Sequence, residues 1–131
     1  MTVICNSNSG KTLASRYLAR GYTAQSEFGI SIDREYAVFG TALWQSLLLF
    51  LISDDNSLPN WYPADLFSIK DGKLGSDWFF NAYAGNEDGL QAIWGYDALV
   101  HDDTHYDALL ERNPEAMKVF YLERAKLVES D

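Results

Sequence analysis

Cysteine is nearly absent from the chain, which excludes one common way of stabilising a small protein. The only cysteine among the 131 residues is Cys5. A single thiol cannot form an intramolecular disulfide, and a chain without disulfides is typical of a reducing compartment. The residues after Met1 also lack the basic region and the apolar core of a signal peptide. We therefore expect a cytoplasmic protein.

Long apolar runs are missing as well. The longest run covers residues 41–52, and Gln45 and Ser46 interrupt it. A helix that crosses a bilayer needs about 20 consecutive apolar residues. The run therefore predicts buried core and no membrane segment.

Basic side chains are few, and they are unevenly distributed. The net charge is −9, from 10 Lys and Arg against 19 Asp and Glu. Residues 1–52 carry four basic and three acidic side chains, whereas residues 53–131 carry six basic and sixteen acidic ones. Phosphate backbones repel such a surface, so we expect no nucleic-acid partner. A basic protein partner and simple solubility both remain compatible with this charge.

No motif for nucleotide binding or nucleophilic catalysis is complete. Gly10-Lys11-Thr12 resembles the end of a phosphate-binding loop, but that motif needs a glycine where this chain has Cys5. Cys5 falls in a predicted strand, and the two histidines are remote in sequence from every serine cluster. Because a nucleophile needs an adjacent base, we expect no enzyme and no cofactor.

Apolar and aromatic residues are abundant, at 47% and 15% of the chain. This composition excludes a disordered chain, and the length fits one domain over residues 1–131. Residues 30–67 contain the longest apolar run and two of the four tryptophans, so we expect the fold to be organised around them. A β-hairpin turning at Gln45-Ser46 is the favoured interpretation, and one helix through residues 37–52 is the alternative.

The remaining pattern predicts an α+β protein. Five or six short strands separated by polar turns indicate a strongly bent antiparallel sheet or an SH3-like barrel within residues 1–100. Pro59 and Pro63 are expected to prevent a regular ladder between them. Residues 101–128 are expected to hold two helices, the second of which begins at Asn113-Pro114-Glu115, a combination of cap, first-turn proline and first-turn acid.

Two histidines form the densest cluster of metal-ligating residue types. His101 and His105 are four residues apart, a spacing that places two ligands on one face of a helix. Asp102 and Asp103, however, are expected to cap the helix that follows them, which leaves His101 outside its first turn. A metal-binding protein or a small enzyme that uses these histidines is therefore the alternative function.

Aromatic residues in a proline-flanked loop are the most informative candidates for binding. Trp61 and Tyr62 lie between the two prolines, and acidic residues flank them in sequence. Aromatic anchors within an acidic rim are typical of protein-binding surfaces. We therefore predict a surface with Trp61 and Tyr62 as anchors, and the alternative is that Trp61 folds back to cover an open end of the barrel. The predicted rim consists of Asp54, Asp55 and Asp65, and a second candidate surface consists of Asp102, Asp103 and Asp107.

Several segments together resemble small bacterial proteins of the toxin-immunity type. The residues that carry this resemblance are 35–40 (EYAVFG), 61–67 (WYPADLF), 77–80 (DWFF), 95–99 (GYDAL), His105-Tyr106 and 110–112 (LER). Proteins of this type are small, acidic and non-catalytic, and they neutralise a toxin by binding it. The resemblance implies a similar role here and supplies no site residues. A structural or interaction domain without a dedicated ligand is a further alternative.

Overall fold

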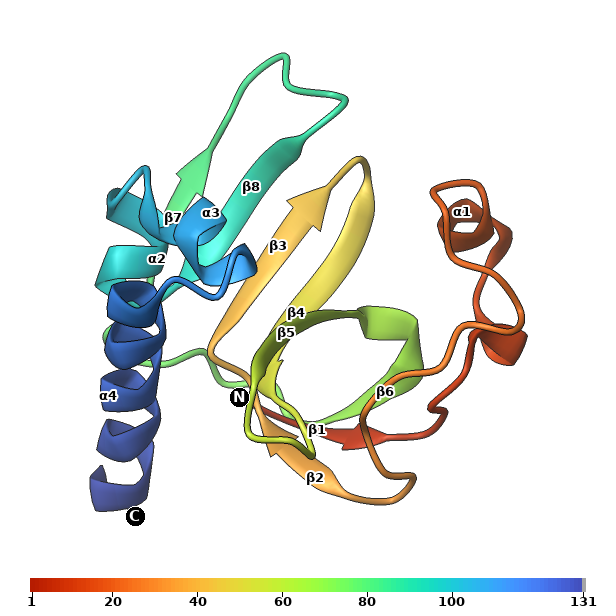
Figure 1. Cartoon of the computed structure of the whole chain (residues 1–131), viewed down its shortest axis with the longest axis horizontal. Helices are drawn as coiled ribbons and strands as arrows, with labels where there is room; N and C mark the ends of the chain where they lie inside the picture. The colour runs from red at the N-terminus through yellow and green to blue at the C-terminus, as the bar shows by residue number, and fades with distance from the viewer. Residues whose placement is uncertain (131) are drawn as a thin grey trace.

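Two antiparallel sheets and a set of C-terminal helices make up the protein (Figure 1). The computed structural model describes residues 1–130, with side chains described as far as Leu127. Within that range the strands are β1 (Thr2–Cys5), β2 (Glu35–Ala37), β3 (Gly40–Trp44), β4 (Leu47–Ser53), β5 (Pro59–Pro63), β6 (Phe67–Asp71), β7 (Phe79–Ala82) and β8 (Leu90–Gly95). The helices are α1 (Ser15–Leu18), α2 (Asp97–His101), α3 (His105–Leu110) and α4 (Pro114–Ser130), with short 3₁₀ turns at Gly10–Thr12 and Ala64–Leu66.

The α+β prediction is confirmed, but the prediction of one bent sheet or an SH3-like barrel is wrong. The three-stranded sheet has the order β2-β1-β6, the five-stranded sheet has the order β5-β4-β3-β8-β7, and the sheets are not closed into a barrel. The chain changes sheet between β2 and β3. The amide of Val38 donates to Met1 O at the first sheet, and the next amide, of Phe39, donates to Leu51 O in the second. This switch divides residues 35–44 between two strands of different sheets.

The hairpin predicted for residues 37–52 is confirmed, and the helix alternative is excluded. Strands β3 and β4 pair antiparallel from Gly40↔Leu51 to Trp44↔Leu47. Gln45 and Ser46 form the turn with φ values of 49° and 65°. Two left-handed residues are the mark of a turn whose twist matches that of the strands.

The expectation that Pro59 and Pro63 prevent a ladder is wrong, because both prolines lie within β5 and pair with β4. The amide of Asp54 donates to Leu58 O at 2.9 Å. Hydrogen-bonded and non-hydrogen-bonded pairs alternate along an antiparallel ladder, so Pro59 and Pro63 fall in non-hydrogen-bonded pairs. Their missing N–H groups therefore face the open edge of the sheet, where a proline is tolerated.

The C-terminal part contains three helices where two are predicted. The extra helix, α2, follows β8 directly and precedes the predicted cap at Asp102-Asp103. The start of α4 is as expected, because Asn113 Oδ1 accepts a hydrogen bond from the amide of Glu115 at 3.0 Å. No helix in residues 1–130 is long and apolar enough to cross a membrane.

The core has two clusters, one between the sheets and one beneath the C-terminal helices. The first surrounds Val3, Cys5 and Phe50, and the second joins Ile93 of β8 to Phe120 of α4. Trp61 packs against both clusters.

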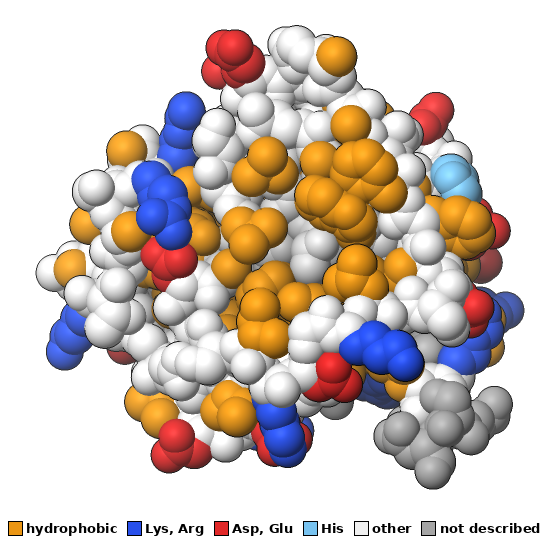
Figure 2. Space-filling view, turned by 180° about the vertical axis from the view of Figure 1, so that it is seen from behind, with side chains coloured by type: hydrophobic (Ala, Val, Ile, Leu, Met, Phe, Trp, Pro, Cys, Tyr) orange, Lys and Arg blue, Asp and Glu red, His pale blue; other side chains and the backbone are white. Residues whose placement is uncertain are grey.

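The face of the five-stranded sheet opposite the helices is partly uncovered. Figure 2 shows apolar side chains gathered on this side of the molecule, with charged side chains mostly at its margins. We call this patch the apolar sheet face. Leu48, Phe80 and Trp94 come from the five-stranded sheet, Ile69 from β6 of the other sheet and Leu74 from the loop after β6. The rings of Phe80 and Trp94 lie 4.8 Å apart on neighbouring strands.

Candidate functional site

The first predicted surface is largely built into the fold. Tyr62 is buried, with 6% of its surface exposed, so the prediction of an exposed anchor is wrong for this residue. Asp54 is also buried, with 5% exposed, which overturns its place in an exposed rim. The structural reason is that Tyr62 lies in β5, where it packs into the first core cluster, and its hydroxyl donates to Asp54.

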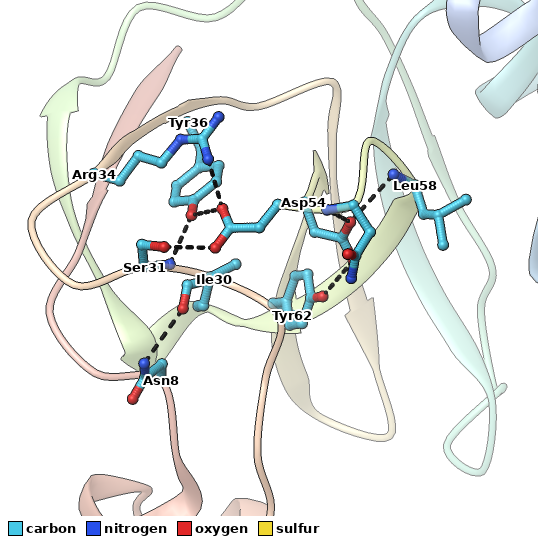
Figure 3. A network of polar contacts seen from close by, with 10 residues as sticks. Asn8, Ile30, Ser31, Arg34, Tyr36, Asp54, Leu58 and Tyr62 are labelled. Carbon is cyan, nitrogen blue, oxygen red and sulfur yellow. Dashed lines mark hydrogen bonds and ion pairs between the residues drawn. The ribbon is translucent and has the colours of Figure 1, made fainter.

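The Asp54 carboxylate organises that connection (Figure 3). Its Oδ1 accepts the amide hydrogens of Asn56 and Leu58 at 2.9 and 3.1 Å. Its Oδ2 accepts Asn60 Nδ2 at 2.7 Å and the hydroxyl of Tyr62 at 2.8 Å. Burial, and then the neighbouring Asp54 carboxylate, raises the pKa of the Tyr62 phenol. Four donors on one carboxylate give Asp54 a structural role.

Asp55 and Asp65 remain at the surface, but both already have partners. Asp55 accepts hydrogen bonds from the hydroxyls of Ser31 and Tyr36 and from the Arg34 guanidinium, groups that Figure 3 shows converging on one point. These bonds lower the pKa of the Asp55 carboxyl, the Ser31 bond most of all.

Asp65 pairs with Arg16 of α1 at 2.8 Å. Like Asp55, Asp65 therefore connects the segment between β1 and β2 (residues 6–34) to the rest of the fold.

Trp61 is half-buried between strand and helix. Its ring lies 5.8 Å from the ring of Tyr106 in α3. The indole Nε1 is buried and has no hydrogen-bond partner among the described residues. The alternative expectation places Trp61 over an open barrel end. The sheets form no barrel, but Trp61 does pack against both core clusters.

The two histidines do not form a shared metal site in the described part of the chain. His101 is the last residue of α2 and His105 is the first of α3, so they are not on one helix. His101 Nδ1 lies 2.7 Å from Asp97, whereas His105 is buried with its Nε2 2.6 Å from the hydroxyl of Tyr96. No group of three metal-ligating side chains occurs in the residues that the structure describes.

The second predicted surface is brought together by the fold and remains exposed. Asp102, Asp103 and Asp107 all line one cavity of about 300 Å³. The α2–α3 connection contributes the first two, and α3 contributes the third. The Thr104 hydroxyl and amide both donate to Asp102, which lowers the pKa of that carboxyl and keeps it ionised.

Aromatic side chains form other walls of the same cavity. Trp44 comes from the end of β3, Tyr83 from the β7–β8 connection and Tyr106 from α3. We call the space between these three rings and the three carboxylates the Trp44 cavity. Burial, and then the charge of Asp107, raises the pKa of the Tyr106 phenol to about 12.

Sequence reasoning identified the acids of this cavity and missed its aromatic walls. Trp44 is half-buried and lies at the end of β3. Trp44 and Tyr106 are far apart in sequence and come together only through pairing of β3 with β8 and packing of α3. No local pattern in the sequence marks them as neighbours.

The segment that supplies most of the cavity's lining residues is strongly acidic. Residues 74–111 contain no lysine or arginine and eight acidic residues, Asp77, Glu87, Asp88, Asp97, Asp102, Asp103, Asp107 and Glu111. This segment forms β7, β8, α2 and α3, which adjoin one another at one end of the molecule (Figure 1). We call it the acidic end.

Comparison of the chain with protein-family models, with curated proteins and with solved structures found no match. Residue roles therefore rest on the geometry and charge of this chain.

Proposed function

We propose that the protein is a non-catalytic binding module for a basic protein partner, which docks at the acidic end. One observation carries the proposal: eight acidic residues and no lysine or arginine lie in the segment that builds this end. Like charges brought close together repel one another, which disfavours the folded state. A bound basic partner would reduce that repulsion, because its positive charges attract the carboxylates of the acidic end.

The Asp103 and Asp107 carboxylates support docking at this end because they remain available. Both residues are exposed. No ion pair in the described part of the chain involves either one. By contrast, Asp54 and Asp55 are fully engaged in holding the β4–β5 connection. The acids of the second surface are therefore the better candidates for contact with a partner.

The negative charge of the acidic end should also affect the rate at which such a partner associates. Complementary charge steers diffusional encounter and accelerates association more than it tightens the final complex. Screening by salt shortens the reach of that field to about 10 Å at 0.1 M ionic strength. Association should therefore slow markedly as salt rises.

Neutralisation of a toxin is the biological role that we propose for such binding, acting in the cytoplasm. The resemblance of the chain to small bacterial immunity proteins supports that role, and the scarcity of cysteine supports the location. An inhibitor of this kind needs no catalytic group, since it acts by covering a surface of its target.

A pull-down from the native host at low and high salt tests the proposal. The wild-type chain is compared with an acid variant carrying Asp102→Asn, Asp103→Asn and Asp107→Asn. The matched control carries Glu27→Gln, Asp33→Asn and Glu115→Gln, which remove the same charge from exposed positions outside the acidic end. We expect one basic protein near stoichiometry with wild type and control, weakened by salt and lost from the acid variant.

Two results would contradict this docking site. Equal recovery by the acid variant and the control would show that the acidic end is not the contact surface. Loss of the partner in Phe80→Ser, with the acid variant unaffected, would instead place docking on the apolar sheet face.

A further inference from the structure

The Trp44 cavity combines two features that favour the same kind of ligand. Three aromatic residues, Trp44, Tyr83 and Tyr106, line it, and the electron-rich faces of aromatic rings attract cations. Its three carboxylates supply negative charge beside those rings. Either feature alone occurs on many protein surfaces, but together they match a positively charged group with an apolar stem.

The size of the cavity limits what can enter it. Ligand-binding cavities in proteins cover roughly 300–1,000 Å³, and this one, at about 300 Å³, lies at the lower limit. It therefore suits a single side chain or a small cation. A nucleotide or another large ligand would not be enclosed.

The walls are held in place by the fold. The ring of Tyr106 packs against the ring of Trp61, 5.8 Å away. Asp102 is oriented by two hydrogen bonds from Thr104. A preformed site loses less entropy when a ligand binds, so these contacts favour binding without rearrangement.

We propose that the Trp44 cavity receives one arginine side chain of the basic partner; the existence of that partner rests on the proposed function. A guanidinium is planar, stacks on aromatic faces and pairs with carboxylates through two parallel hydrogen bonds. It is also more weakly hydrated than the lysine ammonium, so it enters a partly enclosed site at lower cost. Arginine is accordingly the preferred cation.

A small-molecule titration tests this inference without the partner. The probes are N-acetyl-L-arginine amide, the corresponding lysine derivative and the citrulline derivative, which has nearly the shape of arginine without its charge. The chain has four tryptophans, so their indole N–H signals in a ¹⁵N NMR spectrum are few enough to follow separately. A Trp44→Phe variant assigns the reporter, and Trp78, which does not line this cavity, serves as the internal control.

We expect the arginine probe to shift the Trp44 signal and to leave the Trp78 signal unchanged. A single side chain should bind with a dissociation constant on the order of millimolar. Lysine should bind at least about threefold more weakly, because it lacks planar stacking and bidentate pairing. Citrulline should produce no saturable shift.

Variants locate the charge that matters. Asp103→Asn with Asp107→Asn should weaken arginine binding at least about fivefold, since each removes a full carboxylate charge from the cavity. The matched double variant Glu27→Gln with Asp33→Asn should bind as wild type does. Unchanged positions of the other tryptophan signals would show that each variant remains folded.

Three outcomes would overturn the inference: no saturable shift at Trp44, equal responses to arginine and citrulline, or lysine binding as tightly as arginine. The proposed function fails separately. Arginine binding at Trp44 without any basic partner from the host would remove the proposed function and leave the cavity as a guanidinium site. Conversely, a salt-sensitive partner that binds wild type and Trp44→Ala equally, together with no response of the Trp44 signal to arginine, would overturn the arginine inference and leave the proposed function intact.

Discussion

Tyr62 donates its phenolic hydrogen to the buried carboxylate of Asp54 at 2.8 Å, and this bond joins β5 to the residue that follows β4. Both residues belong to a contact surface predicted from the sequence, Tyr62 as an anchor and Asp54 as part of the acidic rim. Their pairing inside the protein shows that they stabilise the β4–β5 connection. The same connection positions Trp61, which in turn supports Tyr106 of the Trp44 cavity.

Removing the Asp54 carboxylate should destabilise the protein strongly. Asp54→Ala leaves four donors without their acceptor, and each buried unsatisfied group costs about 1–3 kcal/mol. Relaxation and water entry reduce that sum, so we expect a loss of about 2–4 kcal/mol. Urea unfolding followed by tryptophan fluorescence measures it. Asp103→Ala, at an exposed position, is the control, and a loss below about 1 kcal/mol for Asp54→Ala would contradict the structural role.

Trp61→Ala should also destabilise the fold, because Trp61 packs against both core clusters. Deleting a buried tryptophan costs about 3–5 kcal/mol, and the partial exposure of Trp61 lowers this to about 2–3 kcal/mol. Trp61→Phe should cost less than about 1.5 kcal/mol, because it keeps a ring against Tyr106 and removes an N–H that has no acceptor. Thermal unfolding of both variants gives the comparison. If alanine and phenylalanine were equally well tolerated, Trp61 would be a surface residue.

His105 should make stability depend on pH between neutral and mildly acidic conditions. Burial lowers its pKa in the folded protein, against the smaller opposing effects of Asp102 and Glu123. The unfolded chain, with a histidine pKa of about 6.5, therefore binds more protons just below that pH. Stability from this group is complete above about pH 6.5 and is lost as the pH falls toward the folded-state value.

Urea unfolding from pH 7.5 to pH 5 tests this prediction. His105→Gln should lower stability at neutral pH by about 1–2 kcal/mol, through its poorer fit to the Tyr96 hydroxyl, and should flatten the pH dependence. His101→Gln, at an exposed position, should keep the slope of the wild type. Equal slopes for the two variants would show that His105 does not carry the effect.

The exposed acids of the Trp44 cavity should lower the stability of the folded protein. Asp103 and Asp107 have no ion-pair partner among the described residues and face other carboxylates. Their replacement by asparagine should leave the protein equally stable or stabilise it by about 0.2–0.5 kcal/mol each at low salt, with the gain disappearing at high salt. Denaturant unfolding at two salt concentrations shows whether this is so. A loss above about 1 kcal/mol would indicate a structural role for these acids.

The apolar sheet face should bind a hydrophobic dye. Phe80 is 54% exposed and rests on the partly exposed ring of Trp94. Phe80→Ser should reduce fluorescence of the dye ANS while changing stability by less than about 1 kcal/mol, since little buried area is lost. Leu122→Ser, which changes a comparably exposed residue of α4, is the control and should leave the dye signal unchanged. Equal signals from both variants would contradict binding at this face.

Elements governed by neighbouring residues could be predicted from the sequence. The turn at Gln45-Ser46 is the only polar pair within an apolar run, and it forms the hairpin. The start of α4 follows from Asn113 and Pro114, whose cap and fixed φ act within one helical turn. The negative charge of the second half of the chain likewise needs no structure to be known.

Pairings between distant residues were decided only by the tertiary structure. The alternation of a single strand does not show which sheet it joins, so the switch between Val38 and Phe39 and the resulting two sheets were not predictable. An aspartate and an aromatic residue a few positions apart look the same in sequence whether they lie on a contact surface or form a buried pair. Asp54 and Tyr62 form a buried pair. Their burial depends on the pairing of β5 with β4, which brings the Tyr62 hydroxyl to Asp54.

The Trp44 cavity shows the same division. The acids of its rim could be identified from sequence alone, because a run of charge is a local property. Its aromatic walls could not, because Trp44 and Tyr106 meet only when β8 pairs with β3 and α3 packs above them. The sequence by itself thus determined the charge of this protein and its local elements, and the long-range packing of sheets and helices decided where that charge meets an aromatic cavity.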